Sequence, residues 1–269
     1  MGMKAYVLNN GWLECDPNWM VSFSTLATLQ EKEKKHGWIK IPVYAVLVDH
    51  PAGKILYDLG CHPDAMKGYW PTGLLSAFPY YYNPGQTLEE QLALTGTKPE
   101  DIKTVVLSHM HLDHAGNLHL FKHADVYVHR KDFEYGQTLV HLSPDPANHG
   151  AYVKADLEVP VKQFHLVDKD FELVPGVELI TLPGHTPGLL GMVVHLEKEG
   201  TFIFPQDALY TRDNYGPPAK ASGIMYDSLA FFASVEKVRE YAKRYNAKVM
   251  FSHDMEFFAS MKKAPAYYE

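Results

Sequence analysis

The stretch SHMHLDHAGN (residues 108–117) contains three histidines and one aspartate within six positions: His109, His111, Asp113 and His114. Side chains alternate along an extended backbone, so His109 and His111 can point the same way and hold one ion. Asp113 and His114 follow after the chain turns and can face a second ion. Neutral imidazole and carboxylate suit Zn²⁺, and imidazole also suits iron and cobalt. The stretch therefore predicts one part of a metal site that needs further ligands.

Four apolar runs of the chain end in a residue that can bind a metal. TVVLS is followed by His109, LITLPG by His185, FIFPQ by Asp207 and VMFS by His253. Each run is typical of a buried strand, and sites in α/β proteins form beyond the carboxyl ends of strands. His185 completes the first group of ligands and His253 the second. Asp207 has two carboxylate oxygens and can bridge the ions, so we predict a two-metal site with room for water.

The composition indicates a folded domain with a large core. The chain has 269 residues, of which 46% are hydrophobic and 21% charged, as in ordinary globular proteins. Predicted strands alternate with predicted helices, of which the clearest are residues 87–96, with a capping box at Thr87 and Glu90, and residues 228–245. This order favours an α/β fold of layered sheets covered by helices, in one domain that spans residues 1–269.

Charge and targeting signals argue against several classes of protein. The formal net charge is −7 and no basic run exceeds a few residues, so we expect no binding of nucleic acid. We find no secretory signal and no apolar run of the length that a membrane span needs, so we expect no membrane association and a cytoplasmic location. Cys15 and Cys61 do not make a disulfide framework and are predicted to be two buried free thiols.

The ligand pattern matches a known family. His-x-His-x-Asp-His followed by a later His, Asp and His resembles the metallo-β-lactamase superfamily, and LYDLG (residues 56–60) resembles its upstream Asp-x-Gly element. The fold that this implies is an αββα sandwich of two mixed β-sheets flanked by helices. Together with SHMHLDHAGN, the stretches LPGHTPG, DALY and FSHDME look like the N-acyl-homoserine lactone lactonases, which degrade quorum signals.

The resemblance implies roles for individual residues. One metal would be held by His109, His111 and His185, the other by Asp113, His114 and His253, with Asp207 as the bridge. Tyr210 matches the tyrosine that assists at the substrate carbonyl in these lactonases.

The expected reaction follows from this site. A hydroxide between two divalent ions, zinc or else iron or cobalt, would attack the lactone carbonyl. One metal and the Tyr210 hydroxyl would stabilise the oxyanion, and the other metal the leaving alkoxide. Asp113 would orient the nucleophile and pass a proton to the leaving oxygen. The predicted protein is therefore a metal-dependent hydrolase of carboxylic esters.

The stretches at residues 17–38, 61–86 and 137–165 are irregular and lie outside these motifs. The second is rich in aromatic side chains, which could line the path of an apolar acyl tail at about 0.8 kcal/mol for each buried CH₂ group. The candidates are Trp70, Phe78, Tyr80, Tyr81 and Tyr82. Residues 17–38 could instead form the interface of a homodimer.

Other polar residues near the motifs are expected to play different roles. His119, His123 and His129 do not have the spacing of ligands and are expected at the surface or in ordinary hydrogen bonds. Asp58 is expected to hydrogen-bond to a ligand or to shape a turn, and a hydrogen bond of this kind would tune the metal.

Several alternatives share the metal core. A lactonase for another ring, such as a pyridoxine-derived lactone, shares the motifs. A glyoxalase II-like thioesterase needs cations near the C-terminus, where Lys262 and Lys263 lie. A phosphodiesterase would need basic residues, and a β-lactamase usually carries an export signal. A diiron oxidoreductase typically has a carboxylate at the position of His111 and a flavin partner domain. A non-catalytic binding module does not explain a full ligand set.

Overall fold

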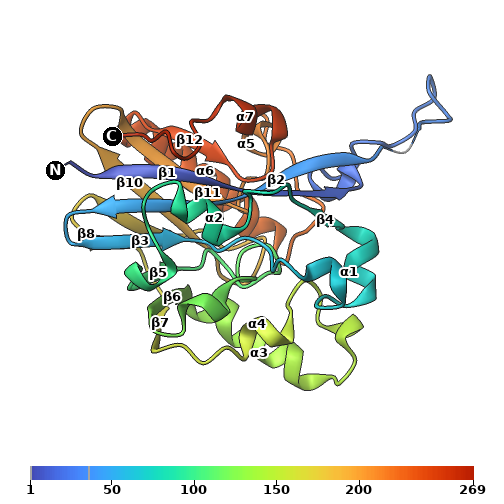
Figure 1. Cartoon of the computed structure of the whole chain (residues 1–269). Helices are drawn as coiled ribbons and strands as arrows, with labels where there is room; N and C mark the ends of the chain where they lie inside the picture. The colour runs from blue at the N-terminus through green and yellow to red at the C-terminus, as the bar shows by residue number, and fades with distance from the viewer. Residues whose placement is uncertain (1, 36) are drawn as a thin grey trace.

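The computed structural model describes residues 2–35 and 37–269, and two β-sheets face each other in it (Figure 1). The strands are β1 (Lys4–Cys15), β2 (Ile39–His50), β3 (Gly53–Tyr57), β4 (Tyr80–Tyr81), β5 (Thr104–Val106), β6 (Asp125–His129), β7 (Gln163–Val167), β8 (Phe171–Val174), β9 (Val177–Thr181), β10 (Leu190–Leu196), β11 (Gly200–Gln206) and β12 (Lys248–Phe251). The α-helices are α1 (Thr72–Ala77), α2 (Leu88–Ala93), α3 (Arg130–Leu142), α4 (Lys154–Leu157), α5 (Arg212–Tyr215), α6 (Ser228–Tyr245) and α7 (Met255–Ser260). Short 3-10 helices are η1 (Pro17–Trp19), η2 (Ala65–Lys67), η3 (Pro99–Asp101), η4 (Leu118–Phe121) and η5 (Pro146–Asn148).

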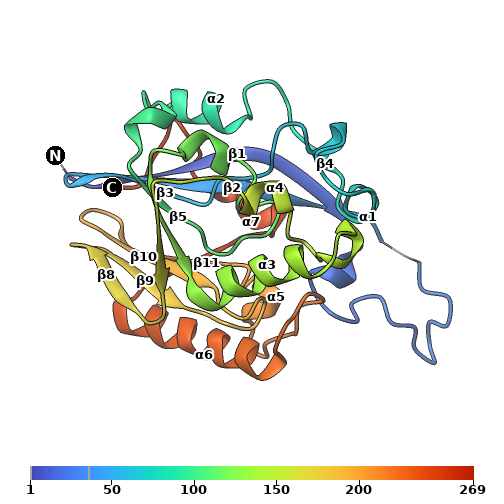
Figure 2. The ribbon, with the colours of Figure 1, turned by 90° about the horizontal axis from the view of Figure 1, so that it is seen from below.

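Both sheets are mixed. The strand order is β4-β1-β2-β3-β5-β6-β7 in the seven-stranded sheet and β12-β11-β10-β9-β8 in the five-stranded sheet. In the first sheet, β1, β2, β3 and β4 pair antiparallel, whereas β3, β5, β6 and β7 pair in parallel. In the second, β8 to β11 pair antiparallel and β11 pairs in parallel with β12. Helices α2 and α6 lie on opposite outer faces (Figure 2), which confirms the predicted αββα arrangement.

Apolar side chains from both sheets fill the space between them. Val46 and Val48 of β2 belong to the same buried cluster as Met192 of β10 and Phe204 of β11. Strand β2 is buried over most of its length. Its uninterrupted apolar run is what a strand with both faces covered requires.

Helix α6 covers the outer face of the second sheet. Its N-terminus is capped by Asp227, whose carboxylate accepts two backbone N–H groups of the first turn, and its C-terminus ends at Asn246 in the left-handed conformation. Phe231 and Val235 pack against the sheet. The predicted helix at residues 228–245 is confirmed, as is the capping box of Thr87 and Glu90 at the start of α2.

The structure contains elements that the sequence pattern did not predict. Helix α3 occupies residues 130–142, and only Asp132, Gly136 and Val140 of it are buried. This narrow face carries little apolar periodicity, so the helix could not be recognised from hydrophobic spacing. The segments predicted as loops at 61–86 and 137–165 also contain α1, β4, α4 and part of β7.

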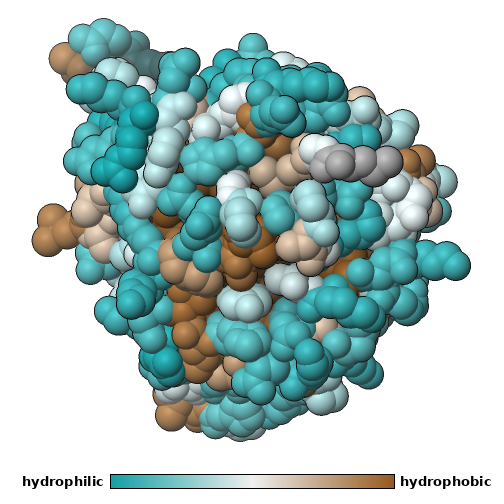
Figure 3. Space-filling model, turned by 90° about the vertical axis from the view of Figure 1, so that its left-hand side faces the viewer, coloured by the Kyte–Doolittle hydropathy of each residue, from teal (hydrophilic) through white to brown (hydrophobic). Residues whose placement is uncertain are grey.

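The two ends of the molecule have different surfaces. After η1, residues 22–35 form an irregular arm that leaves the body (upper right in Figure 1), with Phe23 and Leu29 exposed to 73% and 79%. The end where both termini lie is mainly hydrophilic and carries a hydrophobic strip (Figure 3).

Across the described residues, no helix combines the length and apolar character that crossing a bilayer requires. Cys15 and Cys61 are both buried and free, as predicted.

Candidate metal centre

The seven candidate ligands lie together at the carboxyl ends of strands, and all are buried. Their potential ligand atoms form two groups, each within 4.8 Å: His109, His111 and His185; and Asp113, His114, Asp207 and His253. Four of these side chains lie in the loop after β5, at residues 109–114. The other three, His185, Asp207 and His253, come after β9, β11 and β12. The structure therefore brings together the same side chains that the four apolar runs were expected to deliver.

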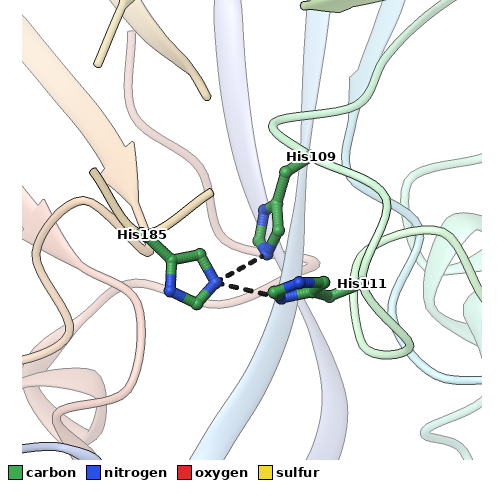
Figure 4. Close-up of side chains that lie close together, drawn as sticks. All are labelled: His109, His111 and His185. Carbon is green, nitrogen blue, oxygen red and sulfur yellow. Dashed lines mark hydrogen bonds between the residues drawn. The ribbon is translucent and has the colours of Figure 1, made fainter. Parts of the chain in front are cut away.

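Three imidazoles form the first group, and their ring nitrogens converge on one point (Figure 4). Nε2 of His185 lies 3.1 Å from Nε2 of His109 and 3.0 Å from Nδ1 of His111. Nitrogens bound at about 2.0–2.1 Å to one tetrahedral zinc ion are about 3.3 Å apart, so the observed spacing is close to that of a coordinated set. A neutral imidazole has only one N–H, so protons cannot satisfy three converging nitrogens as well as one cation can.

The second group is completed by carboxylates, and Asp207 contacts both groups. Its Oδ2 lies 3.3 Å from Nε2 of His114 and 3.4 Å from Nε2 of His185, while its Oδ1 lies 3.2 Å from Nε2 of His253. Nε2 of His114 and Oδ1 of Asp207 are fully buried and make no hydrogen bond within the described residues. Buried polar atoms are normally satisfied, so the donor set fits a second cation, with Asp207 placed to bridge.

Burial and neighbouring charges set the protonation of these ligands in different directions. Burial lowers the pKa of His109 well below its usual value, and His114 and His111 add to the effect, so the ring stays neutral. Burial also lowers the pKa of His114, but Asp113 and Asp207 outweigh it and raise that pKa well above its usual value, so this ring must release a proton to bind a metal. Burial raises the pKa of Asp207, but His114 and His253 hold it well below the usual range. The carboxylate therefore stays ionised.

Asp58 orients one of these imidazoles, in agreement with its expected role. Its Oδ2 lies 2.8 Å from Nδ1 of His114, and the carboxylate also accepts hydrogen bonds from Ser108 and from the amide of Gln206. Asp58 and Gln206 have positive φ angles of 59° and 45°. Such backbone strain concentrates at functional sites. The sequence pattern missed Ser108 and Gln206, and their only signal was that each directly precedes a candidate ligand.

The loop that carries His185 is fixed by helix α6. Gly184 has a φ of 139°, and a Cβ there would lie 2.4 Å from Cα of Phe231. The hydroxyl of Ser234 donates to the carbonyl of Pro183 at 2.7 Å. Close contact with the helix therefore needs glycine directly before His185.

Tyr210 lies at the edge of the cluster and is only 1% exposed. Its hydroxyl oxygen is 2.9 Å from Nδ1 of His185. Burial raises the pKa of Tyr210 well above its usual value, and Asp207 and Asp113 add to the effect, so the hydroxyl keeps its proton. The side chain is thus a hydrogen-bond donor beside the first group of ligands.

Three hollows surround the cluster. A small cavity of about 30 Å³ lies directly on it. Its lining includes Phe78, Asp113, Asp207, Tyr210 and Ile224. A second hollow of about 330 Å³ reaches His111 and His185 from the side of α3, and a third of about 570 Å³ reaches His253. Small molecules can therefore approach both groups of ligands.

Of the five aromatic side chains predicted to line the path of an acyl tail, one borders the cavity. Phe78 lines it. Trp70 and Tyr80 are 2% and 5% exposed and belong to the core cluster beneath the cavity. Tyr82 is half-buried, with its hydroxyl donating to the carbonyl of Pro63, and Tyr81 is 43% exposed and stacks on Trp12. Apart from Phe78, these side chains do not border the cavity. Tyr80 and Tyr81 are held in the sheet because β4 pairs with β1.

The remaining histidines of this region make other contacts. His123 is hydrogen-bonded to the carbonyl of Ile102, and His129 caps the N-terminus of α3. His119 packs against the ring of His62. None of the three belongs to either candidate metal group in the described chain.

Comparison with known proteins decides the family. The sequence profile of the Metallo-beta-lactamase superfamily matches residues 38–253. The chain belongs to this superfamily. The chain is 38% identical to N-acyl homoserine lactonase AiiB of Agrobacterium fabrum, and the match covers 100% of both chains. It is 29% identical to N-acyl homoserine lactonase AttM of Azorhizobium caulinodans over 99% of both chains.

Two solved structures share the fold of this chain. An N-acyl homoserine lactone hydrolase, solved with the product N-hexanoyl-L-homoserine at its catalytic metal centre, superimposes with a TM-score of 0.82 and 24% identity over 100% of both chains. AidC, a dizinc quorum-quenching lactonase, gives a TM-score of 0.66 and 18% identity, with 94% of this chain and 88% of AidC covered. The sandwich fold of this chain is thus shared with these structures.

Proposed function

We propose that this protein hydrolyses the ring ester of N-acyl-L-homoserine lactones at a dinuclear metal centre. The observation that carries the proposal is its 38% identity, over the whole chain, to a lactonase for these compounds. The buried cluster of seven candidate ligands supports it. In this reaction water adds to the lactone carbonyl carbon, the ring C–O bond breaks, and an N-acyl-homoserine with a free carboxylate and a free hydroxyl is released.

We assign the ligands according to the two groups. One ion would be held by His109, His111 and His185 and the other by Asp113, His114 and His253, with Asp207 shared between them. We propose Zn²⁺ because the donors are imidazole nitrogens and carboxylate oxygens, although iron or cobalt would also suit them. When bound, two such ions supply a water that ionises near neutral pH and a Lewis acid for the carbonyl oxygen.

Tyr210 would donate a hydrogen bond to the substrate carbonyl. If Nε2 of His185 binds a metal, the neutral ring carries its proton on Nδ1. This nitrogen then cannot accept a hydrogen bond from Tyr210. The hydroxyl can then accept from Nδ1 at 2.9 Å and still direct its own proton into the cavity. A donor in this place stabilises the charge that develops on the carbonyl oxygen.

Asp113 would act on the nucleophile and on the leaving group. Its carboxylate lines the cavity, and its Oδ2 lies 3.4 Å from Nε2 of His253 and 3.5 Å from Nε2 of His114. Burial raises the pKa of Asp113, but His114 and His253 outweigh it and lower that pKa, so the group is ionised and can accept a proton from water. The same proton would then pass to the departing ring oxygen.

The acyl tail would extend away from the ligand cluster along apolar side chains. Phe78 and Ile224 border the cavity, and Leu139, Pro187 and Met225 line the neighbouring hollow of about 330 Å³. Burial of the tail there contributes about 0.8 kcal/mol for each CH₂ group. Trp70, Tyr80 and Tyr82 would hold the segment that presents Phe78.

We also propose a homodimer in which the arm contributes to the interface. Phe23 and Leu29 of the arm are 73% and 79% exposed, and Trp38 at its base is 54% exposed. Burying apolar surface of this kind favours association. Light scattering tests this directly, since a monomeric mass at working concentration would refute it.

Proton release measured on a substrate panel tests the proposed reaction. The panel contains N-acyl homoserine lactones of several chain lengths, a pyridoxine-derived lactone, a glutathione thioester and a phosphodiester, and metal content is determined on the same sample. We expect the highest kcat/KM for the homoserine lactones and two ions per chain. Thioester activity well above lactone activity, or a preference for the pyridoxine-derived ring, would replace the proposed substrate by that alternative.

A further inference from the structure

His111 differs from the other imidazoles of the cluster. Each of the others has a hydrogen bond at the ring nitrogen that faces away from the cluster: His109 with Ser108, His114 with Asp58, His185 with the carbonyl of Ile224, and His253 with the carbonyl of Pro42. Metal-binding histidines usually need such a partner to fix the ring. Nδ1 of His111 faces His185, and its Nε2 makes no hydrogen bond to any described residue, so something else must hold this ring.

The backbone on both sides of His111 is clamped. The N–H of Met110 donates to Oδ2 of Asp132 at 2.8 Å, and the N–H of Leu112 donates to the carbonyl of Ala151 at 3.0 Å. Asp132 lies in the first turn of α3 and is 0% exposed. Its side chain reaches the loop of His111 instead of the N–H groups of its own helix, so helix stabilisation alone does not explain a buried carboxylate here.

Tyr152 connects the two clamps and touches the imidazole. It follows Ala151 directly, and its ring meets the ring of His111 edge-on, with centroids 4.6 Å apart at 75°. Its hydroxyl donates to Oδ1 of Asp132 at 2.6 Å. The contacts therefore form a closed frame that runs from Asp132 to Met110, past His111 to Leu112, and back through Ala151 and Tyr152.

We propose that Asp132 and Tyr152 are a positioning pair that orients His111 for metal binding, in place of the hydrogen bond that this imidazole lacks. The proposal rests on the proposed metal site and is independent of the substrate. Asp132 fixes the backbone next to the ligand, and Tyr152 fixes the plane of its ring. Loss of either side chain should weaken the binding of the ion held by His109, His111 and His185. The binding of the other ion should stay the same.

The chain offers a matched control in a second buried pair. The hydroxyl of Tyr69 donates to Oδ1 of Asp156 at 2.5 Å, and Asp156 is 1% exposed. This pair joins the segment between η2 and α1 to α4, and among the described residues neither side chain is hydrogen-bonded to the loop of His111. Asp156→Ala and Tyr69→Phe therefore remove the same chemistry at another place.

Zinc binding to the full-length protein tests the pair. Metal-free wild type, Asp132→Ala, Asp132→Asn, Tyr152→Phe and Tyr152→Leu are titrated with zinc against a chelator, and histidine ring signals are recorded by NMR before metal is added. We expect Asp132→Ala and Tyr152→Leu to weaken one of the two binding constants about 10–100-fold, with the other nearly unchanged. The ring signals of His111 should broaden or shift in the metal-free variants. Tyr152→Phe and Asp132→Asn, which keep most of the shape, should give smaller losses.

The outcomes separate this inference from the proposed function. Folded variants that bind both ions as tightly as wild type would overturn the positioning role, as would equal losses in Asp156→Ala. If Asp132→Ala does not fold, Tyr152→Phe and Asp132→Asn decide the question by the same constants. A wild type that binds two ions but opens no lactone would refute the substrate alone, whereas a wild type that binds no metal would refute both.

Discussion

The ligand cluster and the apolar wall beside it are neighbours that are built in different ways. The ligands follow the ends of β5, β9, β11 and β12, and all are buried. The wall comes from connecting segments: Phe78 follows α1 and Ile224 lies between α5 and α6, and both are half-buried. The strand ends thus determine the positions of the ligands, while the connecting segments determine which substrates bind. Changes in the cluster should affect all substrates alike, and changes in the wall should discriminate between them.

The largest effect is expected from Asp207→Ala. This change removes the carboxylate that contacts both groups of ligands, so kcat/KM should fall by more than about 1000-fold, or about 4 kcal/mol, for every acyl chain length. Steady-state kinetics and metal analysis check this result. Asp168→Ala, at an exposed carboxylate directly after β7, is the control and should keep activity. Wild-type activity in Asp207→Ala would remove the bridging role.

Tyr210→Phe should have the next largest effect. It keeps the ring in the core but removes the hydroxyl beside His185, so kcat should fall by about 100-fold while KM changes little. The loss should again be independent of chain length. A change confined to KM would mean that Tyr210 binds the ground state and does not act on the carbonyl oxygen.

The difference between cluster and wall also explains what could be predicted from the sequence. The positions of His109, His185, Asp207 and His253 at strand ends followed from apolar runs that each stop at a polar residue. That signal is local, and the sheets bring the ends together. Helix α3 and the partners of Asp132 depend on contacts between distant segments, and a charged helix with a narrow buried face leaves no hydrophobic period in the sequence.

The aromatic segment illustrates the same limit. Tyr80 lies in β4, and its hydroxyl donates to the carbonyl of Asn10 at 2.6 Å. The pairing of β4 with β1 determines which rings turn inward, and two residues of strand give too short a pattern to reveal it. Phe78, which lies outside the strand, is the member of the set that reaches the cavity.

Phe78→Ala should sharpen the contrast, because it changes the wall without touching the ligands. We expect kcat/KM for a decanoyl lactone to fall by about tenfold, corresponding to one or two CH₂ groups losing burial, and that for a butanoyl lactone to change by less than about twofold. Equal losses for both chains would show that Phe78 does not contact the tail.

The smallest effect on catalysis is expected from Asp156→Asn, which changes stability instead. Burial raises the pKa of Asp156 to about 7 from 3.8, although Tyr69 opposes the shift. Between about pH 4 and pH 7 the unfolded carboxyl loses its proton while the native one keeps it, so the free energy of unfolding of wild type falls as pH rises. Asn mimics the neutral form, and the variant should gain about 2–4 kcal/mol at pH 7 and almost nothing at pH 4.

Urea unfolding at a series of pH values measures this gain. Glu33→Gln on the exposed arm is the control, because its carboxyl stays in water in both states. A gain that is the same at pH 4 and pH 7 would contradict the burial of an ionisable Asp156. Unchanged kcat in the variant would confirm that this pair serves the fold and not the chemistry.

Zinc titration into metal-free protein, with lactone hydrolysis followed at each step, tests the central claim most directly. Two adjacent groups of ligands with a shared carboxylate predict that the metal-free chain is inactive. Activity should rise with added zinc and reach its full value at two ions per chain. Full activity without metal, or complete recovery with a single ion, would contradict a dinuclear hydrolase.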